Sequence, residues 1–209
     1  MVRKRRSTPA HRGSAVFSSI TGVPDTSLAD VSGKGQDVVG MLLAVGGRST
    51  KTKSGIDLGA AAKRLGVTPR TVQRWLAGAG IAGGPGPSAA NTKKLVTASR
   101  QASSTKRGRA AALARSAARQ RLAGGAKLKF DGKQGPHSLE PPYGRDRITE
   151  LTLDPDHVEA MLNAWEDGGE AGFMSWAADF WDENYKDDWK FGGDGEIDVQ
   201  ITPLGPGGH

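Results

Sequence analysis

The stretch "LGAAAKRLGVTPRTVQRWLAG", residues 58–78, carries the side chains with the clearest chemical use in this sequence. Val72 and Trp75 stand three residues apart and therefore share one face of a helix. The opposite face is left to four polar residues, Arg70, Thr71, Gln73 and Arg74. Arginine and glutamine side chains can contact base edges and phosphates when a helix lies in the major groove of DNA. The spacing therefore predicts a helix that contacts DNA.

The same stretch contains the residues that would position such a helix. Six apolar residues are spaced like the core of a helix-turn-helix: Leu58, Ala62, Leu65, Val67, Val72 and Trp75. Gly66 stands at the tight turn, where a positive φ is needed. Thr68 is placed to cap the second helix, and Pro69 suits its first position. Asp57 is interpreted as the cap of the first helix. The pattern predicts a helix-turn-helix, and the alternative is a helical hairpin with no role in DNA binding.

The distribution of charge favours a polyanionic partner. The chain of 209 residues has a formal net charge of +7. Residues 1–147 carry 27 Lys+Arg and 7 Asp+Glu, a net +20, whereas the remainder carries 2 Lys+Arg and 15 Asp+Glu, a net −13. No acid occurs between Asp57 and Asp131, where 15 Lys+Arg fall. Nucleic acid is the leading candidate, because neutralised phosphates release counterions. A soluble basic linker is the alternative.

The segment Ser88–Leu122 is rich in Ala, Arg and Ser and predicts one or two basic helices with a break near Gly108. It has no apolar stripe wide enough to bury much of it, so we expect it to follow the phosphate backbone or to fold on binding it. The candidate DNA-binding residues are Thr68, Arg70, Thr71, Gln73, Arg74, Lys93, Lys94, Arg107, Arg109, Arg115 and Arg119. A solvated helix is the alternative for the basic segment.

The acidic end of the chain predicts a β-α-α-β order. "RITELTL" and "EIDVQI" alternate as strands do, and between them "DPDHVEAMLNAWEDGG" and "AGFMSWAADFWDENY" have helical spacing. Asp154 and Asp156 are interpreted as caps of the first helix rather than as a metal pair. The four histidines show no ligand spacing, and no phosphate loop, nucleophile elbow or metal motif is present. We expect no cofactor and no metal, and interpret the acidic domain as a protein-docking surface or a mimic of DNA charge.

The predicted fold class is mainly α with a small α+β C-terminal domain. The chain is divided into a flexible basic arm (1–35), a helix-turn-helix DNA-binding domain (36–82), basic Arg/Ala-rich helices (83–124), a loop (125–147) and an acidic α+β domain (148–209). The chain has no cysteine, and no apolar run approaches the about 20 residues of a membrane span. We therefore expect a cytoplasmic, nucleoid-associated protein with no membrane partner.

The order and wording of these segments resemble the telomere terminal proteins of Streptomyces-type linear chromosomes and plasmids. The matching words are "AAAKRLGVTPRTVQRWLAG", "ARSAARQRLAGG", "RITELTLDPDHVEAMLNAWEDGG" and "GEIDVQI", between about residues 55 and 202. The resemblance implies a protein covalently attached to the 5′ ends of linear DNA. It would be a primer and not an enzyme: a side-chain hydroxyl receives the first nucleotide, and a DNA polymerase extends it. A telomere-associated partner would recruit it to telomeric ends, where it meets a single-stranded 3′ overhang and duplex DNA.

The resemblance also implies one reachable acceptor hydroxyl, and here the chain departs from the family. The family uses a threonine in the loop between the basic helices and the acidic domain, whereas this loop offers Tyr143 and Ser138 among Gly and Pro. A phenol reaches farther and ionises more readily than an aliphatic hydroxyl, so Tyr143 ranks first and Ser138 second. Thr149, which opens the predicted strand, ranks third, and Ser116 in the basic segment is poorly placed. The alternative role for Tyr143 is a loop aromatic packed on the acidic domain.

Two other functional classes remain open from the sequence. A helix-turn-helix transcriptional regulator with an acidic dimerisation domain would bind a palindromic duplex site without a covalent adduct. A plasmid partition or nucleoid-structuring protein would bind duplex DNA broadly, with little sequence preference. Both share the helix-turn-helix pattern, so only a nucleotide-linked hydroxyl distinguishes the primer.

Overall fold

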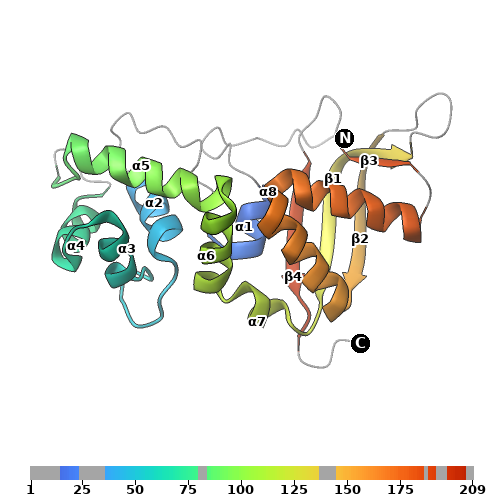
Figure 1. Ribbon diagram of the computed structural model, residues 1–209, viewed down its shortest axis with the longest axis horizontal. Coiled ribbons are helices and arrows are strands. Elements are labelled where there is room, and N and C mark those ends of the chain that lie inside the picture. Colours follow the sequence, from blue (N-terminus) through green and yellow to red (C-terminus); the bar gives the residue numbers. More distant parts are fainter. Residues whose placement is uncertain are drawn as a thin grey trace, which may run out of the picture. The chain divides into compact units, whose positions relative to one another are not determined.

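The computed structural model describes residues 15–23, 36–79, 84–136, 145–185, 188–191 and 197–205. Over these residues the protein is mainly helical, with a small four-stranded antiparallel sheet (Figure 1). This agrees with the predicted class of a mainly α chain with a smaller α+β part. The chain divides into two compact units: unit 1, residues 1–14 and 23–103, and unit 2, residues 15–22 and 104–209.

Unit 1 is helical in its described part and contains α2 (Gln36–Gly46), α3 (Leu58–Leu65), α4 (Pro69–Gly78) and most of α5 (Ala89–Ser104). These helices share one core, which includes Trp75 of α4 and apolar side chains of the other three helices. Five further members are Met41, Leu42, Ile56, Ala61 and Leu95. The core predicted from the sequence is confirmed: Ala62, Leu65, Val72 and Trp75 are buried, and Leu58 and Val67 pack against them.

Individual residues set the ends of α3 and α4. The Asp57 carboxylate accepts a hydrogen bond from the amide of Ala60 at 2.9 Å and so caps the start of α3. α3 ends at Gly66, whose φ of 68° lies in the left-handed region that favours glycine. Thr68 then caps α4, with its Oγ1 accepting from the amide of Thr71 at 3.2 Å. The predicted roles of Asp57, Gly66 and Thr68 are thereby confirmed.

Unit 2 combines a sheet with helices. Its elements are α1 (Ala15–Thr21), α6 (Lys106–Ser116), α7 (Ala118–Leu122), β1 (Ala126–Pro136), β2 (Arg145–Leu153), α8 (Pro155–Asn184), β3 (Trp189–Phe191) and β4 (Asp198–Pro203). β1 is the central strand and pairs antiparallel with β2 on one side. On its other side it pairs with β4 along its first half and with β3 at its end.

Aromatic side chains join the sheet to α8, which crosses one face of the sheet in Figure 1. The ring centroid of Phe130 on β1 lies 5.1 Å from that of Trp181 and 6.0 Å from that of Phe173, both on α8. Along β1, Leu128 and Phe130 are buried and Lys127 is exposed, as expected for a strand with one covered face. The core of unit 2 therefore lies between α8 and the sheet.

α8 is not one continuous helix, because Gly169 interrupts it with φ 66° and ψ −144°. Two helical segments thus lie between β2 and the strands that follow, as the sequence predicts. The predicted β-α-α-β order nevertheless omits β1 and β3. Residues 126–136 of the predicted loop 125–147 form β1. The sequence analysis missed this strand because its glycines and final proline are typical of a loop, although it begins with the alternating pattern "AKLKF".

The predicted flexible arm over residues 1–35 is wrong for residues 15–21, which form α1 within unit 2. Phe17 is buried, and its ring centroid lies 6.0 Å from that of Trp165 on α8. The Ser19 hydroxyl donates to the carbonyl oxygen of Val199 on β4 at 2.6 Å. Burial of the short apolar group Val16, Phe17 and Ile20 fixes a segment whose local composition resembles a linker. Residues 1–14 and 24–35 lie outside the described residues.

The units do not follow the division by charge at residue 147. Unit 1 holds 16 Lys+Arg and 4 Asp+Glu, a net +12, and unit 2 holds 13 Lys+Arg and 18 Asp+Glu, a net −5. The basic helices α6 and α7, predicted as a separate segment with the rest of residues 83–124, belong to the same unit as the acidic sheet. A cut after residue 147 would also divide β2, which pairs with β1 from Arg145 onward.

Candidate nucleic-acid interface

α4 has one buried face and one exposed polar face. Val72 and Trp75 are 0% and 2% exposed, whereas Arg70, Gln73 and Arg74 are exposed. This is the orientation that the sequence predicts for these residues. The exposed face therefore offers two guanidinium groups and one amide to a ligand, all on a helix fixed by Trp75.

The two threonines predicted to contact DNA stand at the start of α4 and bond to each other. The hydroxyl oxygens of Thr68 and Thr71 lie 2.9 Å apart, in addition to the capping bond between Thr68 Oγ1 and the Thr71 amide. Thr68 is exposed and Thr71 is half-buried. These hydrogen bonds stabilise the first turn of α4, the helix from which Arg70 and Arg74 project.

Few carboxylates accompany the cations of unit 1. Its residues 36–79 and 84–103 include ten Lys+Arg but only the acids Asp37 and Asp57, and the carboxylate of Asp57 caps α3. Lys93 and Lys94, both predicted to bind DNA, are exposed on α5. The described surface of unit 1 is therefore strongly cationic, which favours attraction of a polyanion.

Arg109, which the sequence predicts to bind DNA, is only 6% exposed, and its side chain is engaged inside unit 2. Its Nε donates to the carbonyl oxygen of Glu166 at 2.9 Å, and its Nη2 donates to that of Asp167 at 2.7 Å. These carbonyls belong to the last turn of α8 before the interruption at Gly169. A Cβ at Gly169 would lie 3.1 Å from Arg109 Nη1, so the close approach and the positive φ both favour glycine there.

Arg119 likewise bonds to α8, although 37% of its side chain stays exposed. Its guanidinium forms ion pairs with Glu166, at 2.9 Å, and with Glu159, and it donates to Asn163 Oδ1 at 2.9 Å. Burial opposes the charged form, but the hydrogen bonds to Glu166 and Glu159 raise the pKa of Arg119 overall. Residues 159, 163 and 166 are spaced so that these acceptors lie on one face of α8. This spacing is the sequence signal from which a partner for Arg119 within the protein could have been found.

The remaining cations of α6 also belong to unit 2. Lys106 forms an exposed ion pair with Asp167 at 2.6 Å, and the hydrogen bond to this carboxylate raises the pKa of Lys106. Arg107 is exposed, and Arg115 is half-buried. α6 and α7 thus direct several of their cations at the carboxylates and carbonyls of α8, within unit 2.

The candidate acceptor hydroxyls are only partly described. Ser138 and Tyr143 lie outside the described residues. Thr149 lies within β2, where its hydroxyl donates to Oε1 of Gln134 at 2.9 Å, and Gln134 is itself 1% exposed. Thr149 is therefore a residue of the sheet and not of a flexible loop. The Ser116 hydroxyl donates to the carbonyl oxygen of Leu113 within α6, at 3.2 Å.

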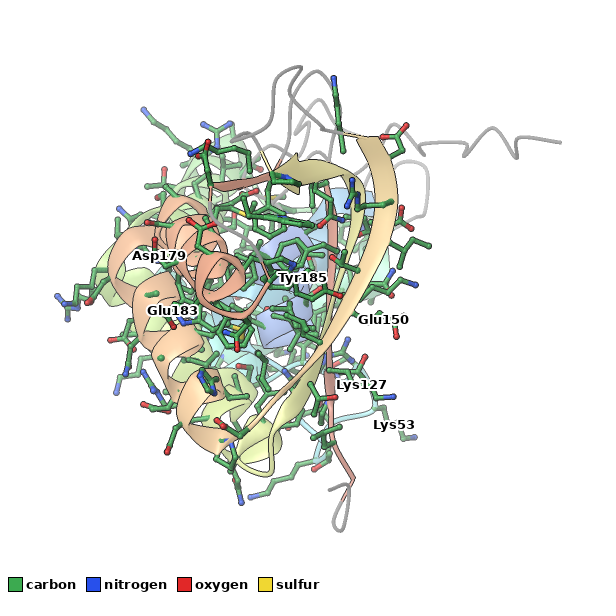
Figure 2. The ribbon with its side chains drawn as sticks, turned by 90° about the vertical axis from the view of Figure 1, so that its right-hand side faces the viewer. Lys53, Lys127, Glu150, Asp179, Glu183 and Tyr185 are labelled. Atoms are coloured by element: carbon green, nitrogen blue, oxygen red, sulfur yellow. The ribbon has the colours of Figure 1, made fainter. Side chains whose placement is uncertain are left out.

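Sequence reasoning did not single out Tyr185, the residue after α8, which is 62% exposed. Figure 2 shows Tyr185 at the end of α8, with Asp179 and Glu183 on the outer side of that helix. The Tyr185 ring packs edge-on against Trp189, with centroids 5.7 Å apart. The sequence "WAADFWDENY" does not show which of its aromatic side chains is exposed, so no sequence signal singled out Tyr185.

Asp154 of unit 2 has a structural role at the start of α8. Asp154 accepts from the amide of His157 at 2.9 Å and caps α8, as predicted. This bond and those from the His157 ring lower the pKa of Asp154. Within the described residues, no group of three or more His, Asp or Glu side chains is arranged to hold a metal ion. No helix in the described part of the chain combines the length and apolarity needed to cross a bilayer.

Comparisons with protein-family models, with curated proteins and with solved structures found no match for this chain. The resemblance to telomere terminal proteins therefore depends on the sequence words quoted above. The function must be inferred from the residues, their burial and their charge.

Proposed function

We propose that this protein binds duplex DNA through unit 1, with α3 and α4 as a helix-turn-helix and α4 in the major groove. The observation that carries the proposal is the division of α4 into two faces. Val72 and Trp75 fix one face in the core, and Arg70, Gln73 and Arg74 are exposed on the other. Arginine pairs with guanine and with phosphate, and glutamine pairs with adenine, so this face has the groups needed for direct readout.

The charge of unit 1 supports the same ligand. Residues 1–14 and 23–103 carry a net charge of +12, which attracts phosphate over a long range. A protein ligand with charges of both signs would be attracted much less. Lys93 and Lys94 on α5 would add contacts to the backbone, which position a protein without reading sequence. Arg109 and Arg119 are not part of this interface, since both are held by α8.

We further propose that the DNA-bound protein is a telomere terminal protein, a primer attached to the 5′ ends of a linear replicon. Support for this role comes from the resemblance of residues 55–202 to that family. A DNA polymerase and a telomere-associated protein would be its partners, and it would be nucleoid-associated as a consequence of DNA binding. The exposed acids of α8, such as Asp179 and Glu183, make unit 2 the better candidate for the protein contacts. The regulator with a palindromic site is the competing function.

Replacing Arg74 with alanine tests the proposed interface. We expect Arg74→Ala to weaken binding to a duplex site by about 1–3 kcal/mol, because one base or phosphate contact is lost. That loss corresponds to about five- to 150-fold in Kd. The measurement is fluorescence anisotropy of the full chain on labelled duplex DNA at moderate salt, with circular dichroism to confirm that the variant is folded.

Lys127→Ala is the matched control, because Lys127 is exposed on β1 in unit 2 and its replacement removes the same charge. We expect the control to bind like the wild-type protein. Equal affinities of Arg74→Ala and wild type would show that the exposed face of α4 is not the DNA-binding surface.

A further inference from the structure

The loop that joins α2 to α3, residues 47–57, has a defined structure in unit 1. We refer to it as the basic loop. Its two sides are joined by an antiparallel bridge between Arg48 and Ile56. The amide of Ser49 donates to the carbonyl oxygen of Gly55 at 2.9 Å. The basic loop is thus closed at its base like a short hairpin.

Further hydrogen bonds fix the tip of the basic loop. The Thr52 hydroxyl donates to the carbonyl oxygen of Ile56 at 2.8 Å, and the amide of Gly55 donates to the carbonyl oxygen of Thr52 at 3.1 Å. The amide of Lys51 donates to Ser49 Oγ at 3.2 Å. Ile56 is buried in the core of unit 1, so the loop is anchored to the domain that carries α4. A ligand would therefore meet a preorganised loop, at a small entropic cost.

The basic loop displays cations and hydroxyl groups. Arg48, Lys51 and Lys53 are exposed, and the intervening residues of "RSTKTKS" are all serine or threonine. Figure 2 shows the Lys53 side chain extending away from the ribbon. The one acid at its end, Asp57, is used as the cap of α3. Ammonium groups held on a fixed backbone are among the groups that contact phosphate oxygens in protein–DNA complexes.

We propose that the basic loop is a second DNA contact of unit 1, which binds phosphates of the backbone beside the groove that α4 occupies. The inference rests on the proposed function, because that function sets the position of the DNA. In helix-turn-helix docking the first helix crosses the backbone while the second enters the groove. The basic loop leads directly into α3, so its cations lie next to the crossing helix. Its contribution is to affinity, equally for all sequences.

The test is the double variant Lys51→Ala/Lys53→Ala of the full chain, titrated with duplex DNA over a series of KCl concentrations. Each phosphate contact contributes about 0.9 to the slope of log K against log salt. Loss of two contacts should reduce the slope by about 1.8 and weaken binding about tenfold to 100-fold at 0.1 M salt. The reduction should be the same for a specific and an unrelated duplex. Both lysines are exposed, so the fold should be unaffected.

Lys127→Ala/Lys129→Ala, on β1 of unit 2, is the control with equal loss of charge, and we expect it to keep the wild-type slope. If the loop variant keeps the wild-type slope and affinity while Arg74→Ala weakens binding, the second contact is refuted and the proposed function stands. An equal loss in both double variants would also refute it, because net charge alone would then explain the result. If the full chain binds no duplex DNA, the proposed function fails and the second contact fails with it.

Discussion

Arg109→Ala is expected to destabilise unit 2 by about 3–5 kcal/mol and to leave the affinity for DNA unchanged. The guanidinium donates to the carbonyl oxygens of Glu166 and Asp167, which end the first helical segment of α8. Hydrogen bonds from a charged donor are worth about 1.5–3 kcal/mol each, and the alanine side chain also leaves space beside Gly169. Urea unfolding followed by tryptophan fluorescence measures the loss, because four of the five tryptophans lie in unit 2.

Arg107→Ala is the natural control for this prediction. Arg107 stands two residues earlier on α6 and is exposed, so its replacement should change the free energy of unfolding by less than about 0.5 kcal/mol. The two variants have the same net charge, and any effect of charge on DNA binding should therefore be equal in both. An Arg109→Ala protein with wild-type stability and reduced DNA affinity would restore the prediction that Arg109 contacts DNA.

The sequence predicted α3 and α4 well because their signals are local. Asp57, Gly66 and Thr68 act on amides or torsion angles within three residues, and the core of α3 and α4 follows from helical periodicity. Such patterns are read directly from adjacent residues. The basic loop was missed because its cations belong to no helix or strand motif, and its fixed shape depends on hydrogen bonds that composition does not reveal.

Unit 2 was predicted less well because its decisive contacts are distant in sequence. Arg109 bonds to residues 57 and 58 positions later, and Ser19 bonds to a residue 180 positions later. An arginine-rich helix has the same composition whether its partners are phosphates or the carboxylates and carbonyls of another helix. The sequence therefore predicted one basic surface where the structure places part of the basic residues against α8.

The candidate acceptor hydroxyls could be limited by sequence only to Tyr143, Ser138 and Thr149. A loop rich in Gly and Pro predicts access for the first two, and the structure does not describe them. The sequence predicts that Thr149 begins a strand. Its hydrogen bond to the buried Gln134 could not be predicted, because Gln134 lies in β1, which the sequence analysis predicted as loop. The contact makes Thr149 the weakest of the three acceptors.

The full chain, incubated with the cognate DNA polymerase, Mg²⁺, a labelled deoxynucleotide and a telomeric 3′ end, is expected to acquire one covalently bound nucleotide. The acceptor oxygen attacks the α-phosphate of the deoxynucleotide, a phosphate ester forms, pyrophosphate leaves, and the hydroxyl proton passes to water or a base of the polymerase. The polymerase would hold the Mg²⁺ ions that stabilise the transferring phosphoryl group. The label is measured on denaturing gels after nuclease digestion, and peptide mapping gives its position.

Tyr143→Phe is expected to abolish the label while DNA binding remains, with Ser138→Ala as the variant that would do so if the acceptor is the serine. Thr149→Val should keep the label, because the Thr149 hydroxyl is bonded inside the sheet, and valine suits a strand. Tyr185→Phe is the matched control, since it removes the only other tyrosine, which is well exposed. Alkali separates the two chemistries: a serine or threonine ester can eliminate, and a tyrosine ester cannot. An unlabelled wild-type chain in the presence of its partners would reject the primer in favour of the regulator with a palindromic site.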